Sequence, residues 1–135
     1  MRILIAEDDF SIRSLLLQFL KHYGEVDAAV NGVQAVDVFV HALEEKKPYD
    51  IIFLDVMMPE MNGLEALGNI RNKEQSYGIT PDDEVKIVMA TALNSSKDVL
   101  DAYYMGGCND YIIKPFNLEA LAKLLERYGF SRHSK

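Results

Sequence analysis

The chain has 135 residues, of which 49% are hydrophobic and 26% are charged, and its formal net charge is −7. This length and composition are typical of one globular domain with its own core rather than of a disordered chain. The acidic excess argues against a nucleic-acid partner, because phosphate backbones are bound by Lys and Arg. The single cysteine, Cys108, cannot form an internal disulfide, which favours a reducing compartment. The apolar run in "MRILIAEDD" is too short for a signal peptide and nothing approaches a membrane span, so we expect a cytoplasmic protein.

Short apolar runs alternate with segments of helical spacing along the chain. The runs predict strands, most of them covered on both faces, at residues 2–6, 26–30, 51–54, 85–90 and 110–113. Apolar side chains at helical spacing predict helices at residues 11–23 and 32–46, after Asn62, and at 95–106 and 117–128. Residues suited to capping these helices are Ser11, Asn31, Asn62, Ser95 and Asn117, and Gly24 and Gly129 stand where helices should stop.

The alternation of five strands with five helices predicts an α/β fold, with a parallel sheet covered by helices on both faces. Because crossovers are right-handed, few topologies remain, and the commonest is the flavodoxin-like strand order 2-1-3-4-5. The polar stretch 72–84 is interpreted as one long loop. We expect one domain over residues 1–130 and a short tail over 131–135.

Polar residues follow four of the predicted strands. The first strand ends in "EDD" at 7–9, which contains Asp8 and Asp9, and the buried run "IIFL" ends on Asp55. Thr91 and Lys114 follow the fourth and fifth strands. Ligands of open α/β sheets bind at the carboxyl ends of the strands. Since strands one and three are neighbours in the expected order, Asp8, Asp9 and Asp55 should converge at this edge.

Three carboxylates this close repel one another unless a cation neutralises them. Mg2+ is the natural choice, because this hard ion takes one or two carboxylates and keeps waters for a further oxygen ligand. The Lys114 ammonium and the Thr91 hydroxyl lie opposite in the predicted arrangement. Together these groups form a receptacle for a phosphoryl group, with the Asp55 carboxylate as the nucleophile that attacks phosphorus.

Each of these residues alone has an ordinary structural explanation. An aspartate after a strand is usually a turn residue or a helix cap, and the acidic run before "FSI" could complement a helix dipole. Thr91 alone is more often a strand-end residue, and Lys114 alone a solvated lysine. The convergence of four strands on one edge is what favours a functional site.

Competing site chemistries do not fit. The acidic loop after the first strand lacks the G-x-G-x-x-G of dinucleotide-binding folds, and no G-x-S-x-G elbow is present. Haloacid dehalogenase-like phosphatases carry a second aspartate two residues after the nucleophile, where this chain has Met57. A turnover phosphatase is therefore a poor interpretation.

The segments "AEDDFS", "FLDVMMPEMNGLE", Ala90-Thr91 and "DYIIKPF", in this order, resemble the receiver domain of bacterial two-component response regulators. The resemblance covers residues 2 to about 128. It implies that Asp55 is the phospho-acceptor and that Asp8 and Asp9 are the acidic pair that holds Mg2+. Asp55 itself and the backbone carbonyl of Met57 would complete the protein's metal ligands.

The resemblance also implies the parts of a conformational switch. Thr91 corresponds to the switch hydroxyl, Tyr111 to the switch aromatic residue and Lys114 to the lysine that contacts the phosphoryl group. Pro115 matches a proline whose preceding peptide bond is usually cis. One residue more than usual lies between Thr91 and Tyr111, and the 72–84 segment is also long for the family.

The function implied is a signalling module that accepts a phosphoryl group from a sensor histidine kinase or a histidine phosphotransfer protein. It would pass the signal to a downstream protein through the face of the fourth helix, fifth strand and fifth helix. It would accept one phosphoryl group per Asp55 and is not a turnover enzyme. Only "GFSRHSK" follows the last predicted helix, which favours a single-domain regulator. The alternative is an isolated receiver fragment of a larger response regulator or hybrid kinase.

Overall fold

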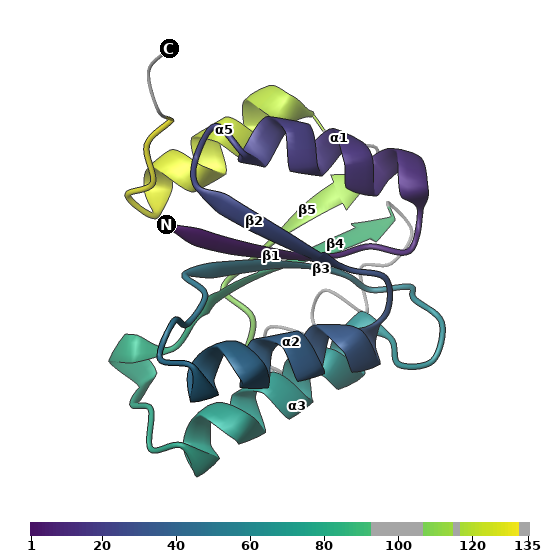
Figure 1. The fold of residues 1–135 in the computed structure, drawn as a ribbon. Helices are drawn as coiled ribbons and strands as arrows, with labels where there is room; N and C mark the ends of the chain where they lie inside the picture. The colour runs from purple at the N-terminus through teal and green to yellow at the C-terminus, as the bar shows by residue number, and fades with distance from the viewer. Residues whose placement is uncertain (93–106, 115–116, 133–135) are drawn as a thin grey trace.

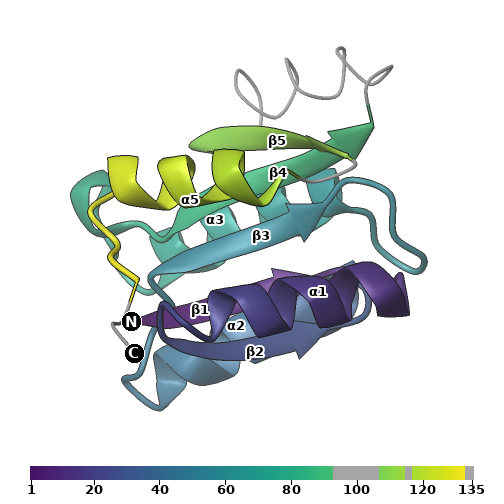
Figure 2. The ribbon, with the colours of Figure 1, turned by 90° about the horizontal axis from the view of Figure 1, so that it is seen from above.

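The computed structural model describes residues 1–92, 107–114 and 117–132, which form a single parallel sheet with helices on both faces (Figure 1). The strands are β1 (Arg2–Ala6), β2 (Glu25–Ala29), β3 (Ile51–Asp55), β4 (Lys86–Ala92) and β5 (Asp110–Lys114). Their order is β2-β1-β3-β4-β5, and all four pairings are parallel, which confirms the predicted fold class. Seen from above, the arrowheads of the strands point the same way, so the carboxyl ends share one edge (Figure 2).

In the described ranges, two pairs of helices cover the sheet. On one face lie α1 (Phe10–Leu20) and α5 (Leu118–Arg127), and on the other lie α2 (Gly32–Glu44) and α3 (Gly63–Ser76) (Figure 1). The predicted helix at 95–106, with its cap Ser95, lies outside the described residues. Within the ranges that are described, no helix is both long enough and apolar enough to cross a membrane.

The sheet separates two apolar cores, because successive side chains of a strand point to opposite faces. Ile3 and Ile5 of β1 pack in the core under α1 and α5. Leu4 and Ala6 pack in the core against α2 and α3. All four side chains are fully or almost fully buried, which explains why the strand sequence lacks polar alternation.

Three of the predicted helix caps are confirmed, and one is wrong. Asn31, Asn62 and Asn117 accept backbone N–H groups in the first turns of α2, α3 and α5. The cap of α1 is Asp9 instead of Ser11, because the carboxylate of Asp9 accepts the N–H of Ile12 at 3.0 Å. The first helix therefore begins earlier than its apolar spacing indicates.

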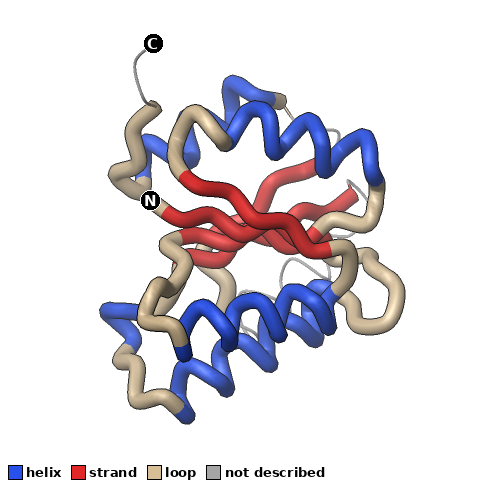
Figure 3. The backbone as a smooth tube through the Cα atoms, in the orientation of Figure 1, coloured by secondary structure: helices blue, strands red, loops and turns tan. Residues whose placement is uncertain are grey.

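The prediction of one long loop over 72–84 is also wrong in part. Helix α3 continues to Ser76, and a short 3-10 helix, η1 (Pro81–Asp83), follows it (Figure 3). The last turns of α3 bury Arg71 and Glu74, which are polar, so the hydrophobic spacing that predicts helices is missing there.

Candidate functional site

The carboxyl edge of the sheet holds a buried carboxylate, Asp55, at the end of β3. Only 3% of Asp55 is exposed, and its Oδ1 accepts the backbone N–H of Met57 at 3.2 Å. The first turn of α3 closes against it, because the N–H of Gly63 donates to the carbonyl oxygen of Val56 at 2.9 Å. The capping box formed by Asn62 and the third helical residue fixes where that helix begins. Asp55 is thus held between a strand end and a helix start.

Lys114, the last residue of β5, reaches across the edge to two carboxylates. Its Nζ lies 2.9 Å from Asp55 Oδ2 and 3.0 Å from Glu7 Oε1. Glu7 is almost fully buried, and its other oxygen accepts the N–H of Asp9 at 3.1 Å. The long Lys114 side chain therefore joins the carboxyl end of β5 to those of β1 and β3, although β4 lies between β3 and β5.

The acidic cluster at this edge consists of Glu7, Asp8 and Asp55, whose ligand oxygens all lie within 4.8 Å of one another. The sequence assigned Asp9, together with Asp8, to this cluster. The structure places the Asp9 carboxylate at the start of α1, where it caps the helix through Ile12, and puts Glu7 in the cluster in its place. Glu7 is the residue that the sequence reasoning missed.

Burial and neighbouring charges shift two pKa values at this edge. Burial is the main cause that raises the pKa of Glu7, and the nearby Asp55 carboxylate raises it further. Lys114 and the Asp9 N–H lower it, and the pKa of Glu7 that results is about 7. Burial alone would lower the pKa of Lys114, but its bonds to Asp55 and Glu7 outweigh burial and raise it. Lys114 is therefore a firmly protonated cation, whereas Glu7 gains and loses a proton near neutral pH.

The donor set fits a hard divalent cation. Three carboxylates offer oxygen ligands only, which suits Mg2+. Glu7 Oε1 is buried without a hydrogen bond in the described part of the chain, although the Lys114 ammonium is close enough for an ion pair. Asp8 is exposed, so the cluster opens to solvent on one side. A cation could therefore enter from solvent and bind the carboxylate oxygens of Glu7, Asp8 and Asp55 beside Lys114.

The remaining predicted residues lie around this cluster. Thr91 of β4 is buried, one residue beyond the position that pairs with Asp55. Met57 follows Asp55 with 70% of its side chain exposed, and Tyr111 of β5 is 39% exposed. Pro115 lies outside the described residues. The structure thus brings Asp8, Asp55 and Lys114 together, and it places Thr91 on the strand between those of Asp55 and Lys114.

Comparison with known proteins gives consistent results. The response regulator receiver domain family matches residues 3–126. The chain is 34% identical over 129 residues to the chemotaxis protein CheY of Listeria monocytogenes, covering 94% of this chain and 97% of that protein.

Solved structures are similar over nearly the whole chain. The receiver domain of the response regulator Ssk1 of Saccharomyces cerevisiae, co-crystallised with the histidine phosphotransfer protein Ypd1, has 35% identity and a TM-score of 0.81, covering 96% of this chain and 88% of that one. The receiver domain of the Arabidopsis thaliana histidine kinase CKI1, complexed with Mg2+, has 28% identity and a TM-score of 0.80, covering 94% and 90%. The chain belongs to the response regulator receiver domain family.

Proposed function

We propose that Asp55 accepts a phosphoryl group from the phosphohistidine of a histidine kinase or a histidine phosphotransfer protein, and that this changes the binding of a partner protein. The observation that carries the proposal is the buried Asp55 carboxylate, with the Lys114 ammonium 2.9 Å away and two further acidic side chains beside it. A carboxylate oxygen forms the new bond to phosphorus as the phosphorus–nitrogen bond of the donor breaks. Each chain accepts one phosphoryl group.

Two similar structures support the choice of donor and of metal. The Ssk1 receiver was crystallised with a histidine phosphotransfer protein, which is the kind of donor that we propose. The CKI1 receiver was crystallised with Mg2+. We propose that Glu7, Asp8 and Asp55 hold Mg2+ here, with the Met57 carbonyl as a further ligand. When bound, the metal supplies positive charge to the oxygens of the transferring phosphoryl group.

The chain's own residues position and neutralise the phosphoryl group. Lys114 is already aimed at Asp55, so its ammonium can contact a phosphoryl oxygen once the Asp55 oxygen carries phosphorus. Its raised pKa keeps it protonated at any physiological pH. Thr91, on the intervening strand, supplies the hydroxyl for another oxygen. Met57 donates its N–H to Asp55 Oδ1, and its largely exposed, apolar side chain would border the route by which water approaches.

The output surface that we propose is the face of the predicted fourth helix at 95–106, which lies outside the described residues, together with β5 and α5. Tyr111 and Ile113 of β5 and Leu118 of α5 are between about one-third and two-fifths exposed, so apolar area is available for a partner there. The phosphoryl group would act on this face through Thr91, the penultimate residue of β4, and Lys114, the last residue of β5.

Phosphorylation of the purified chain tests the proposal. With a small acyl phosphodonor and Mg2+, the wild-type chain should take up one phosphoryl group, and Asp55→Asn should take up none. Asp82→Asn is the matched control, because it removes the same charge from the exposed 3-10 helix η1. Label on Asp55→Asn at the wild-type level would refute the assignment.

The switch is tested separately. Thr91→Ala should still be labelled but should lose the phosphorylation-dependent change in partner binding or self-association. Equal affinity of a captured partner for both phosphorylation states of the wild-type chain would refute the proposed output.

A further inference from the structure

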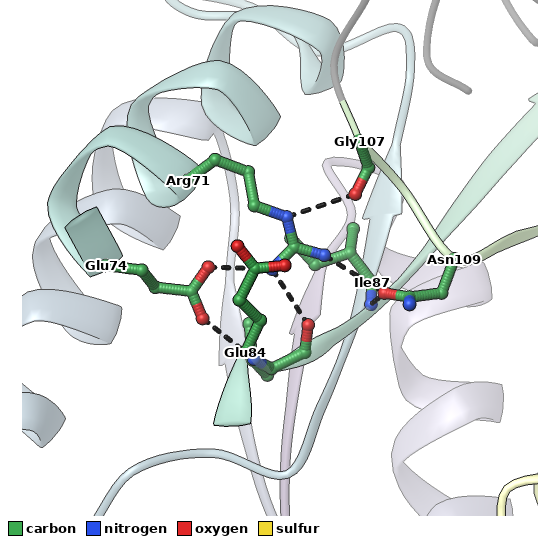
Figure 4. A network of polar contacts seen from close by, with 7 residues as sticks. Arg71, Glu74, Glu84, Ile87, Gly107 and Asn109 are labelled. Carbon is green, nitrogen blue, oxygen red and sulfur yellow. Dashed lines mark hydrogen bonds and ion pairs between the residues drawn. The ribbon is translucent and has the colours of Figure 1, made fainter. Parts of the chain in front are cut away.

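A buried arginine at the far end of the sheet joins three segments of the chain (Figure 4). Arg71 of α3 donates from Nε to the carbonyl oxygen of Gly107 at 3.0 Å and from Nη2 to Asn109 Oδ1 at 3.0 Å. Its Nη1 contacts Glu74 Oε1 at 2.7 Å and the carbonyl oxygen of Val85 at 2.9 Å. Only 9% of Arg71 and 1% of Glu74 are exposed. The arginine thus connects α3 with the residues that precede β4 and β5.

Asn109, the residue before β5, pairs with β4 while its side chain accepts a hydrogen bond from Arg71. Its backbone N–H donates to the carbonyl oxygen of Ile87 at 2.8 Å, and its side-chain Oδ1 accepts the N–H of Ile87 at 2.8 Å. The side chain therefore supplies the acceptor that a backbone carbonyl supplies in an ordinary strand pair. Because Arg71 bonds to the same Oδ1, it orients the amide and fixes which atom faces Ile87.

Strand β5 has fewer other constraints on its register than the inner strands have. Like β2 at the opposite end of the sheet order, it pairs with one strand only among the described residues. Its five residues alternate between intermediate and exposed, and none is fully buried. Ile112 packs against the core under α1 and α5 but is only partly buried. A strand whose faces are this incompletely buried specifies its register weakly, and a slip of one residue turns every side chain to the other face of the sheet.

The register of β5 decides where Lys114 lies. Asn109 is five residues before Lys114, which corresponds to about 16 Å along a strand. In the observed register, Val88 pairs with Asp110 and Thr91 pairs with Ile113, and this brings Lys114 Nζ to Asp55 and Glu7. A slip would move that ammonium by about 3 Å and turn it away from the acidic cluster.

We propose that Arg71, acting through Asn109, locks the register of β5 and is thereby a positioning residue for Lys114. The inference rests on the proposed function only in that Lys114 is taken to assist phosphorylation of Asp55. Arg71 itself touches none of the reacting groups. It acts only by fixing the register of β5, which sets the position of Lys114 at the other end of that strand.

The experiment compares Glu74→Gln with the double variant Arg71→Met/Glu74→Gln. Removal of Arg71 alone would leave the Glu74 carboxylate buried and unpaired, whereas in Glu74→Gln the arginine keeps the Glu84 carboxylate as a partner at 3.9 Å, so Glu74→Gln is the matched background. The two variants then differ in the arginine, its hydrogen bonds to Gly107, Val85 and Asn109, and its ion pair with Glu84. All proteins are compared at a temperature at which circular dichroism shows each to be fully folded.

Labelling of Asp55 by an acyl phosphodonor in saturating Mg2+ is the functional measurement. We expect Glu74→Gln to be labelled within about twofold of wild type, and the double variant about fivefold to tenfold more slowly than Glu74→Gln. With Lys114→Ala added to both, the loss due to Arg71 should disappear. A role in general stability would persist without Lys114, so an equal loss in that background would overturn the proposal, as would no loss at all.

Amide hydrogen exchange gives a readout that does not depend on phosphorylation. The N–H groups of Ile87 and Asn109 should exchange at least about tenfold faster in the double variant than in Glu74→Gln, while those of β1 stay unchanged. Unchanged protection at these two amides would overturn the register lock. A wild-type chain that takes up no label would refute the proposed function instead, and the exchange rates would then decide the register lock alone.

Discussion

Gly63, the first residue of α3, lies so close to the end of β3 that the smallest side chain should displace Asp55. A Cβ at this position would lie 2.2 Å from the carbonyl oxygen of Asp55 and 2.9 Å from its carbonyl carbon. An acceptable contact with that oxygen needs at least about 3.0 Å, so the helix or the strand end must move by about 1 Å. Both groups belong to the backbone and neither can rotate aside. Gly63→Ala should therefore alter both stability and the geometry of the acceptor.

The expected magnitudes follow from this displacement. Overpacking of this kind costs about 1–3 kcal/mol of unfolding free energy. A shift of about 1 Å at a reacting group can slow its reaction by up to about a hundredfold. Gly68→Ala, on the same helix, is the control, because a Cβ at Gly68 would have no heavy atom within 4 Å among the described residues, apart from its chain neighbours and the backbone of its own helix. It should stabilise the chain by about 0.5–1 kcal/mol, since alanine favours helix more than glycine does.

Urea unfolding followed by circular dichroism, and the initial rate at which Asp55 is labelled, measure the two effects. The same substitution at two positions of one helix should thus change stability in opposite directions. If Gly63→Ala matched Gly68→Ala in unfolding free energy and in labelling rate, the close approach of α3 to Asp55 would not control the site.

Three further outcomes are expected. In metal-free protein the pKa of Glu7 is raised from 4.5 to about 7, so the stability that the protonated Glu7 side chain contributes is complete below about pH 4.5 and is lost as pH rises through about 7. Between pH 5 and pH 8, urea unfolding should therefore show Glu7→Gln gaining about 2 kcal/mol of unfolding free energy relative to wild type. A pH-independent difference would contradict this. Asp9→Ala should lose about 1 kcal/mol of unfolding free energy, because a helix cap is removed, but should keep its Mg2+ affinity. Asp8→Ala should bind Mg2+ at least about tenfold more weakly by calorimetry. Weaker Mg2+ binding by Asp9→Ala and unchanged binding by Asp8→Ala would instead make Asp9 the ligand. Met57→Asn should shorten the lifetime of label on Asp55, because a polar side chain beside Asp55 can orient the attacking water and the exposed, apolar Met57 side chain cannot. An unchanged or slower decay would contradict this role of Met57.

The sheet and the meeting of its carboxyl ends could be predicted because both follow from simple patterns. Apolar runs without polar alternation require strands that are covered on both faces, and the β1 and β3 side chains are indeed buried on both. Once the strands are parallel, the residues that end them must share an edge. The contact between Lys114 and Asp55 at 2.9 Å is a consequence of this topology.

The membership of the acidic cluster could not be predicted in the same way. Three acidic residues in a row, Glu7 to Asp9, all suit a metal, and the choice among them depends on where α1 begins. Helix starts are the least regular part of a sequence pattern, and Ser11 is as suitable a cap as Asp9. Asp9 caps α1 in the structure, and this removes its carboxylate from the cluster and leaves Glu7 beside Lys114.

The contacts of Arg71 with Glu74, Gly107 and Asn109 could not be predicted from the sequence, for a different reason. Periodicity detects buried faces through apolar residues, and here the buried face of α3 carries an arginine and a glutamate that satisfy each other. Charged residues on a helix are ordinarily assigned to solvent. Their burial depends on partners such as Gly107 and Asn109, which are distant in the sequence and come close only in the folded chain.

Strand β5 is thus held by polar contacts at both ends, and these contacts differ in what they respond to. At the amino end of β5, Arg71 holds Asn109 through a hydrogen bond that involves no residue of the acceptor site. At the other end, Lys114 pairs with Asp55, so a change in the charge of that carboxylate acts directly on it. Because Asn109 stays fixed by Arg71 while the partner of Lys114 changes, the backbone of β5 should move mainly near Lys114. The proposed output surface should therefore change most around Ile113 and least around Asp110, where Arg127 of α5 adds a further ion pair at 2.8 Å.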